Sequence, residues 1–196
     1  MVHDELDNNL LEKTNVDVRP MKLRDVAQMA NWGLHEDLRY DAYNFPYRTQ
    51  HEYFQWYRSK RQAFRKYLFG AYLGDELIGY ITLKQIKWIR REAFMGIVFN
   101  PDRMNGGYGT SALKAYLDIV TKAYGMKKIH LKTACFNIRG QRCYEKAGFR
   151  VVDRKFEPYE DQSQNFELML KYGDFQMVGL ELWTEYIYMD YIADNK

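Results

Sequence analysis

The chain has 196 residues, of which 46% are hydrophobic and 16% aromatic, a composition typical of a globular domain with a sizeable core. Its net charge of +3 is small beside 29 basic and 26 acidic side chains, so charge alone does not indicate nucleic-acid binding. No apolar run approaches the roughly 20 residues that a membrane span needs, and the start of the sequence has no signal-peptide pattern. We therefore expect a cytoplasmic protein without a membrane partner.

The elements expected at the start of the chain are short. Residues 1–14 are polar and acidic and predict a flexible N-terminal arm, followed by one domain over residues 15–196. Alternating apolar residues predict a first strand that ends near Pro20. A short helix is expected over residues 24–33.

An aromatic loop over residues 39–48 leads into the next predicted helix. Thr49 and Glu52 have the spacing of a capping box, and the helix is expected to extend to about residue 64. Basic residues crowd its end, namely Arg58, Lys60, Arg61, Arg65 and Lys66. We interpret this cluster as a solvated helix face, with a nucleic-acid patch as the alternative.

Two apolar runs, residues 67–72 and 77–85, are separated by a turn sequence and predict a hairpin. A further strand is expected over residues 92–99. After it, apolar residues recur with helical spacing and predict an amphipathic helix that stops at Gly125.

The last part of the chain gives weaker signals. Strands are predicted over residues 149–156 and 186–192, the second of which closes the sheet. Between them we expect two further strands, residues 166–170 and 176–182, joined by a turn.

The cysteines and histidines show no ligand-like spacing. Cys135 and Cys143 fall on a predicted strand and a predicted helix, and we expect buried, reduced thiols there. The four histidines are scattered, so no metal is expected.

A glycine-rich turn between the strand at residues 92–99 and the next helix is the most informative segment. Pro101 ends the strand, and Gly106, Gly107 and Gly109 leave the backbone amides of the turn uncovered. Amides at a helix N-terminus attract anions, so the turn predicts a site for a phosphorylated cofactor. The sequence matches neither a P-loop nor a dinucleotide-binding turn.

A second block follows about thirty residues later, over residues 129–149. Together the two blocks resemble the Gcn5-related N-acetyltransferases, the GNAT superfamily, in the style of its ribosomal-protein and spermidine-type members. In the second block, Asn137, Tyr144, Gly148 and Phe149 fall in register with the family signature, and Gly140 replaces its usual alanine.

The resemblance implies an α/β (α+β) fold with a central mixed, mostly antiparallel twisted sheet flanked by helices. In this fold the fourth and fifth strands splay apart and form the cleft for acyl-CoA. Acetyl-CoA is the implied co-substrate, and an amine is the implied acceptor.

The resemblance also assigns the cofactor-binding residues. The backbone of Ile97, Val98 and Phe99 is expected to bind the pantetheine arm and the oxyanion. Asn137 is expected to reach the same arm, to cap its helix, or to do both. The loop is expected to bind the phosphates through Met104, Asn105, Gly106, Gly107, Tyr108, Gly109 and Thr110. The loop signature of the family begins with glutamine or arginine, a position that Met104 occupies in this chain. An arginine, Arg103, comes one residue before it.

Two catalytic roles follow from the resemblance. Tyr144 is the expected general acid for the departing thiolate, since a phenol near pKa 10 can protonate a thiolate whose acid has a pKa near 8.5. Phe94 occupies the strand position that is often acidic in relatives. Glu92, two residues earlier, is the replacement candidate for the general base, with a surface charge as the alternative.

The acceptor is expected between the loop at residues 40–47 and the segment at residues 156–184, both rich in aromatic residues. The carboxylates of these segments suit a cation, and they include Asp41, Glu157, Glu160, Asp161 and Glu167. We expect a primary amine on a small cationic molecule or a protein N-terminus. A non-catalytic acyl-CoA-binding regulatory module is the alternative, and the oligomeric state, a homodimer included, is left open.

Overall fold

The structure is a computed structural model that describes residues 16–61 and 66–193. The predicted N-terminal arm and the end of the second predicted helix, residues 62–64, lie outside the described residues. The assignment of residues 15–196 to one domain stays a prediction.

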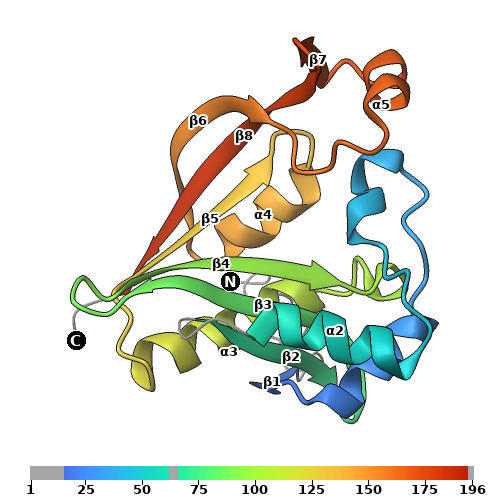
Figure 1. Cartoon of the computed structure of the whole chain (residues 1–196). Helices are drawn as coiled ribbons and strands as arrows, with labels where there is room; N and C mark the ends of the chain where they lie inside the picture. The colour runs from blue at the N-terminus through green and yellow to red at the C-terminus, as the bar shows by residue number, and fades with distance from the viewer. Residues whose placement is uncertain (1–15, 62–65, 194–196) are drawn as a thin grey trace, which may run out of the picture.

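A twisted eight-stranded sheet forms the centre of the molecule, in the order β1-β2-β3-β4-β5-β8-β6, with β7 paired to β8 (Figure 1). The strands are β1 (Asp17–Pro20), β2 (Tyr67–Leu73), β3 (Glu76–Lys87), β4 (Glu92–Phe99), β5 (Lys128–Ala134), β6 (Arg150–Pro158), β7 (Phe175–Val178) and β8 (Glu181–Ile192). The pair β4–β5 is parallel and the other pairs are antiparallel. The predicted mixed, mostly antiparallel sheet is confirmed.

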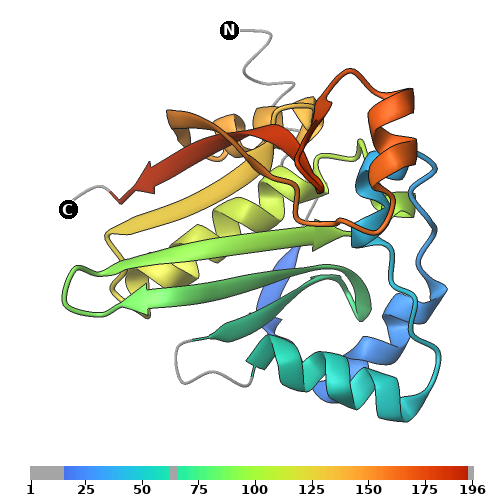
Figure 2. The same ribbon diagram turned by 45° about the horizontal axis from the view of Figure 1, so that its top comes forward.

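Helices cover both faces of this sheet (Figure 2). They are the 3-10 helices η1 (Leu23–Asn31), η2 (Leu38–Tyr43) and η3 (Pro101–Arg103) and the α-helices α2 (Gln50–Arg61), α3 (Tyr108–Lys122), α4 (Ile138–Lys146) and α5 (Asn165–Lys171). On β3, the side chains of Ile81 and Leu83 join the core under α3 and α4, whereas Tyr80 joins the core under η1 and α2. This alternation is the two-residue period of a strand that is covered on both faces.

Local chemistry sets several of the helix ends. At the start of α2, the Thr49 amide donates to Glu52 at 2.8 Å and the Glu52 amide donates to Thr49 Oγ1 at 3.3 Å, which confirms the predicted capping box. Gly125 and Gly148 follow α3 and α4 with φ angles of 65° and 103°. Both glycines adopt a backbone conformation that other residues rarely take, so they end the helices as predicted.

The segment between β6 and β8 departs from the prediction. Residues 166–170 are predicted as a strand, but they lie in α5, which buries Leu168 and leaves Phe166 and Leu170 exposed by 72% and 77%. The next predicted strand, residues 176–182, is divided by a turn at Gly179 into β7 and the start of β8.

The aromatic loop also has more structure than expected. Its first half forms η2, in which the Asp37 carboxylate accepts from the Arg39 amide at 3.0 Å. Arg39 then reaches Asp174, before β7, with an Nη1–Oδ2 distance of 2.7 Å. These contacts attach η2 to the part of the chain that carries α5 (Figure 1).

Candidate active site

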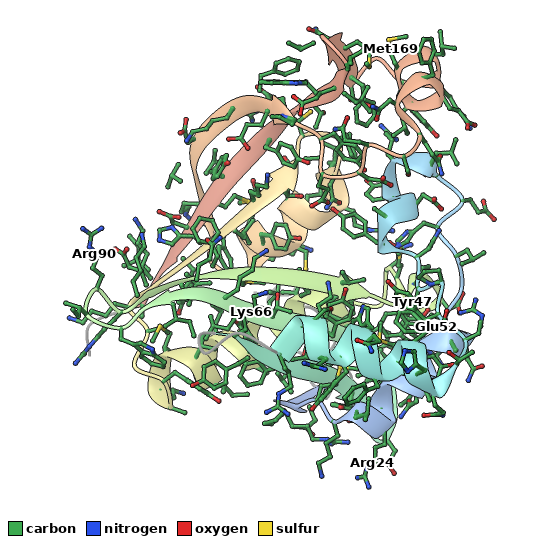
Figure 3. The ribbon with its side chains drawn as sticks, viewed as in Figure 1. Arg24, Tyr47, Glu52, Lys66, Arg90 and Met169 are labelled. Carbon is green, nitrogen blue, oxygen red and sulfur yellow. The ribbon has the colours of Figure 1, made fainter. Side chains whose placement is uncertain are left out.

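The site begins where β4 and β5 separate. The two strands pair through only three residue pairs, and the last of these joins Phe94 to His130. Beyond it, β4 stays paired with β3 while β5 stays paired with β8, so a V opens between them (Figure 1). Arg90, in the turn before β4, marks the closed end of this V (Figure 3).

A cavity of about 1220 Å³ occupies the open end of the V. Most of the residues predicted to bind the cofactor or act in catalysis line it: Ile97, Val98, Phe99, Met104, Asn105, Gly107, Tyr108, Gly109, Thr110, Asn137 and Tyr144. Gly106 and Glu92 are not among the lining residues. The structure therefore brings both sequence blocks to one cavity.

The turn before α3 lines this cavity. Gly107 precedes the helix with φ 77°, Asn105 has φ 66°, and the first helical bond runs from the Ser111 amide to the Gly107 carbonyl at 3.2 Å. The amides of the first three helical residues, 108–110, have no acceptor within the helix. They add to the positive end of a fifteen-residue helix.

Two glycines of this turn have packing roles. A Cβ on Gly109 would lie 3.1 Å from Cys143 Sγ on α4, so this glycine allows close approach of α3 and α4. A Cβ on Gly106 would meet the Tyr108 ring at 2.4 Å. Gly106 thus makes room for a ring that lines the cavity, although it does not line the cavity itself.

Met104 occupies the first position of the predicted phosphate-binding loop, where the family signature has glutamine or arginine. Met104 and Arg103 both line the cavity, but the Arg103 guanidinium is held by the Glu76 carboxylate through two bonds of 2.8 and 2.9 Å. Further cations at this end come from α4, namely Arg139, Arg142 and Lys146. An anion bound at the turn would therefore meet positive side chains as well as amides.

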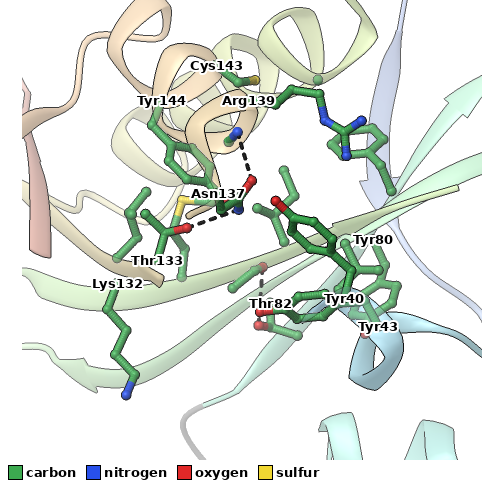
Figure 4. Close-up of a pocket in the computed structure, with 18 of the residues that line it drawn as sticks. Tyr40, Tyr43, Tyr80, Thr82, Lys132, Thr133, Asn137, Arg139, Cys143 and Tyr144 are labelled. Atoms are coloured by element: carbon green, nitrogen blue, oxygen red, sulfur yellow. Dashed lines mark hydrogen bonds between the residues drawn. The ribbon is translucent and has the colours of Figure 1, made fainter. Parts of the chain in front are cut away.

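Asn137 caps α4 and makes one hydrogen bond at each end of its side-chain amide. Its Oδ1 accepts from the Gly140 amide at 3.0 Å, and its Nδ2 donates to Thr133 Oγ1 at 3.0 Å (Figure 4). A Cβ on residue 140 would lie 2.5 Å from Nδ2, which explains glycine at this position. The second Nδ2 proton is what Asn137 retains for a ligand in the cavity.

Tyr144 lies on the buried face of α4 and is 9% exposed. Burial, with smaller contributions from Cys143 and Glu160, raises the pKa of Tyr144 above the usual phenol range. The hydroxyl therefore keeps its proton at neutral pH, as a proton donor must. Tyr40 points into the cavity from η2, on the side opposite α4 (Figure 4).

The structure does not support Glu92 as the general base. Glu92 pairs with Lys128 and Lys87 at the closed end of the V, before the strands separate. Phe94 comes two residues later, lines the cavity and stacks on His130 with ring centroids 5.0 Å apart. Glu92 shares the face of Phe94, but its position along β4 keeps it out of the cavity.

Of the five acidic residues expected near the acceptor, only Glu160 lines the cavity. The Tyr43 hydroxyl donates to Glu160 Oε1 at 2.5 Å. Three of the others accept hydrogen bonds elsewhere: Asp41 from the Gln164 side chain, Glu157 from the Tyr188 hydroxyl and Asp161 from the Ser163 amide. The fourth, Glu167, is exposed.

Sequence reasoning missed several lining residues on the side of the sheet that α2 covers. They are His35, Lys60, Tyr80, Thr82, Lys84, Lys132 and Tyr188. The alternation of Tyr80, Thr82 and Lys84 along β3 was the available signal, because alternate residues of a strand share a face. Burial and nearby Arg139 lower the pKa of His35, so its ring is neutral at pH 7.

Among the described residues, no group of histidine, cysteine or acidic side chains has the arrangement of a metal site. Cys135, in the turn after β5, and Cys143 are unpaired and only partly buried. No helix within residues 16–61 and 66–193 has the length and apolar character that crossing a bilayer requires.

Comparison with known proteins identifies the family. A spermidine N(1)-acetyltransferase of Vibrio cholerae is 28% identical over 102 residues, which cover 49% of this chain and 59% of that protein. The alignment therefore spans less than two thirds of the relative's length.

Solved structures share the fold. The crystal structure of the Vibrio cholerae spermidine N-acetyltransferase in complex with CoA and spermine has a TM-score of 0.66 at 18% identity, covering 90% of this chain and 95% of that one. A structure of the spermidine/spermine enzyme with manganese ions has a TM-score of 0.61 at 18% identity, with 90% and 92% covered. Residues 15–150 match the family described as acetyltransferase (GNAT) domain. The chain belongs to the GNAT acetyltransferase family.

Proposed function

We propose that this chain is an N-acetyltransferase that moves the acetyl group of acetyl-CoA to a primary amine. The observation that carries the proposal is one cavity that joins the amides at the start of α3, the unpaired edge of β4, Tyr144 and the carboxylate of Glu160. An acyl-CoA and an amine can meet there on opposite sides of the same strand edge.

The residues fit acetyl-CoA along its length. The turn before α3 and the cations of α4 suit the phosphates. Along β4, successive N–H groups point alternately to the two neighbouring strands, and past Phe94 β4 has no partner on the β5 side. Within residues 97–99, backbone groups therefore face the V, where they can pair with the pantetheine arm.

The acceptor amine would bind beside Glu160, as an ammonium that transfers a proton to this carboxylate before it reacts. The amine nitrogen attacks the thioester carbonyl carbon, and a backbone amide of β4 donates to the oxygen that becomes negative. The C–N bond forms, the C–S bond breaks, and sulfur leaves as a thiolate. Tyr144 protonates this thiolate, and the nitrogen then gives its remaining extra proton to the Tyr144 phenolate, so that the amide, the free thiol and a neutral tyrosine result. Glu160 releases the proton that it took from the ammonium to solvent. The relatives named for spermidine support an amine acceptor.

Release of free thiol from acetyl-CoA in the presence of a panel of amines tests the proposal. Amino acids, amino sugars, polyamines and N-terminal peptides form the panel, and mass spectrometry identifies the acetylated product. A non-catalytic module would bind acetyl-CoA without amine-dependent thiol release. Assembly into a homodimer stays a prediction.

A further inference from the structure

The side of the cavity under α2 has a floor made of three strands. Tyr80, Thr82 and Lys84 of β3 lie opposite Val98, Gly96 and Phe94 of β4, and residues directly opposite in paired strands share a face. Phe94 is in turn opposite His130 of β5, so Lys132 also belongs to this face. We call the lining residues of this face the acceptor floor: Tyr80, Thr82, Lys84, Phe94, Gly96, Val98 and Lys132.

A further lysine reaches this floor from α2. Lys60 Nζ lies 5.7 Å from the ring centroid of Trp56 and 5.8 Å from that of Tyr80, and it lines the cavity. Its position is separate from the cations at the cofactor end, which come from η3 and α4. The acceptor floor therefore has its own positive charge, opposed by one lining carboxylate, Glu160.

These lysines differ in their partners. Lys132 is held by Glu157 at 3.5 Å and lies 4.0 Å from the centroid of the Tyr186 ring. Across the part of the chain that the structure describes, no carboxylate lies within ion-pair distance of Lys60 or Lys84. Within the described residues, Lys60 and Lys84 therefore line the cavity without an ion-pair partner.

The unpaired lysines also act on each other. Burial lowers the pKa of Lys60, nearby Lys84 and Lys66 lower it further, and Glu160 opposes the shift. An anion bound between Lys60 and Lys84 would relieve this repulsion. A purely cationic molecule such as a polyamine would increase it.

We propose that the acceptor is a primary amine that also carries a carboxylate or a phosphate, with this anion bound by Lys60 and Lys84 and the ammonium facing Glu160. The inference rests on the proposed function and narrows its substrate. It replaces the expectation of a small cationic acceptor, because Glu160 alone cannot balance the lysines of the acceptor floor.

Matched pairs of acceptors test the inference. Phosphoethanolamine with ethanolamine and glucosamine 6-phosphate with glucosamine test phosphate, and L-amino acids with their amides test carboxylate. We expect kcat/KM to be about tenfold or more higher for the anionic member of at least one pair, since a bond between charged groups is stronger than a neutral one. Equal or lower values for the anionic member of every pair, or spermidine as the best acceptor, overturn the inference.

Variants then locate the effect. The double substitution Lys60→Met with Lys84→Met should abolish the preference and leave the affinity for acetyl-CoA unchanged. Lys87→Met, on the same strand but outside the cavity lining, is the matched control and should retain the preference. If the double variant loses affinity for CoA but not for 3′-dephospho-CoA, the lysines bind the cofactor phosphate and the inference is wrong.

Equilibrium binding separates this inference from the proposed function. Calorimetry with the same anionic amines on CoA-saturated protein measures the anion site without acetyl transfer. Binding that is lost in the double variant and kept in Lys87→Met supports the inference, even if no amine accelerates thiol release and the proposed function fails. Binding that is equal in all three proteins, or absent from all of them, overturns the inference.

Discussion

The Tyr43 hydroxyl donates a 2.5 Å hydrogen bond to Glu160 Oε1 and so joins η2 to the segment between β6 and α5, and both residues line the cavity. Tyr159 reinforces this connection, since its hydroxyl donates to the Arg39 carbonyl at 2.7 Å. The carboxylate that we assign to the amine is therefore held in place by a neighbouring phenol.

Glu160→Gln removes the negative charge but keeps the shape of the side chain. We expect the Michaelis constant of the amine to rise about tenfold, because an ammonium loses its charged partner, and kcat to fall, because glutamine cannot accept the proton of the amine, while the affinity for acetyl-CoA stays unchanged. Steady-state kinetics and calorimetry measure the two effects. Glu167→Gln, at an exposed position on α5, is the control, and an equal effect of both variants would remove Glu160 from the acceptor site.

Gly109→Val tests the phosphate-binding turn. A valine side chain at this position would begin 3.1 Å from Cys143 Sγ and would displace the start of α3 relative to α4. We expect the affinity for acetyl-CoA to fall about tenfold or more, measured by calorimetry on protein whose thermal unfolding remains cooperative.

Gly74→Ala provides a control for that variant. Gly74, in the β2–β3 hairpin, has φ 59° and open space around its missing Cβ, so the substitution strains the backbone far from the cavity. It should lower stability slightly and leave cofactor affinity unchanged. Unaltered affinity in folded Gly109→Val would contradict the assignment of the turn.

Elements fixed by local chemistry could be predicted from the sequence. The bounds of β4 follow from its apolar run and from Pro101, and the end of α4 follows from Gly148. Asn137 as the cap of α4 follows from its position and side chain. In each case a few neighbouring residues determine the conformation, so long-range packing is not needed to infer it.

Features set by packing between distant segments could not be predicted in this way. The apolar residues within 166–170 are compatible with a strand, yet the segment forms α5, in which Leu168 packs with Phe175 and Leu182. Glu92 and Phe94 share a face, but only the register of β4 with β5 shows that the V opens after Phe94. The sequence predicts Lys60 on a solvated helix face, whereas the structure places its Nζ 5.8 Å from the Tyr80 ring centroid and in the lining of the cavity.

The pH profile distinguishes the acceptor amine from Tyr144. Burial raises the pKa of Tyr144 above its usual value near 10, so the phenol stays protonated up to a higher pH than a free tyrosine. The rate at subsaturating amine should fall once the pH exceeds the pKa of the amine, because the ammonium is the form that binds. No part of the fall below pH 10 should come from Tyr144.

Kinetics with two acceptors whose amines differ in pKa show which group causes the fall in rate at high pH. The falling limb of kcat/KM should move with the pKa of the amine. A limb that stays near pH 10 with both acceptors would indicate an ordinary phenol at residue 144 and contradict the effect of burial.

Tyr116→Phe should stabilise the protein. Tyr116 is fully buried on α3, and its hydroxyl has no hydrogen-bond partner among the described residues. A buried unsatisfied hydroxyl is costly, so its removal should raise the free energy of unfolding by about 1 kcal/mol and the melting temperature by about 2–4 °C. Thermal and urea unfolding measure this, and a lower stability would indicate a partner for the hydroxyl.

Tyr144→Phe removes the proposed proton donor and keeps the ring. Because the thiolate would then leave without a positioned acid, we expect kcat to fall about a hundredfold, with the affinity for acetyl-CoA almost unchanged. Tyr116→Phe is the matched control, since it also removes one hydroxyl from a buried tyrosine, but from one outside the cavity lining. Its kcat should equal that of the unmodified protein. A Tyr144→Phe variant with full activity would leave this tyrosine a packing role on α4, where its ring contacts Phe149 at a centroid distance of 6.2 Å.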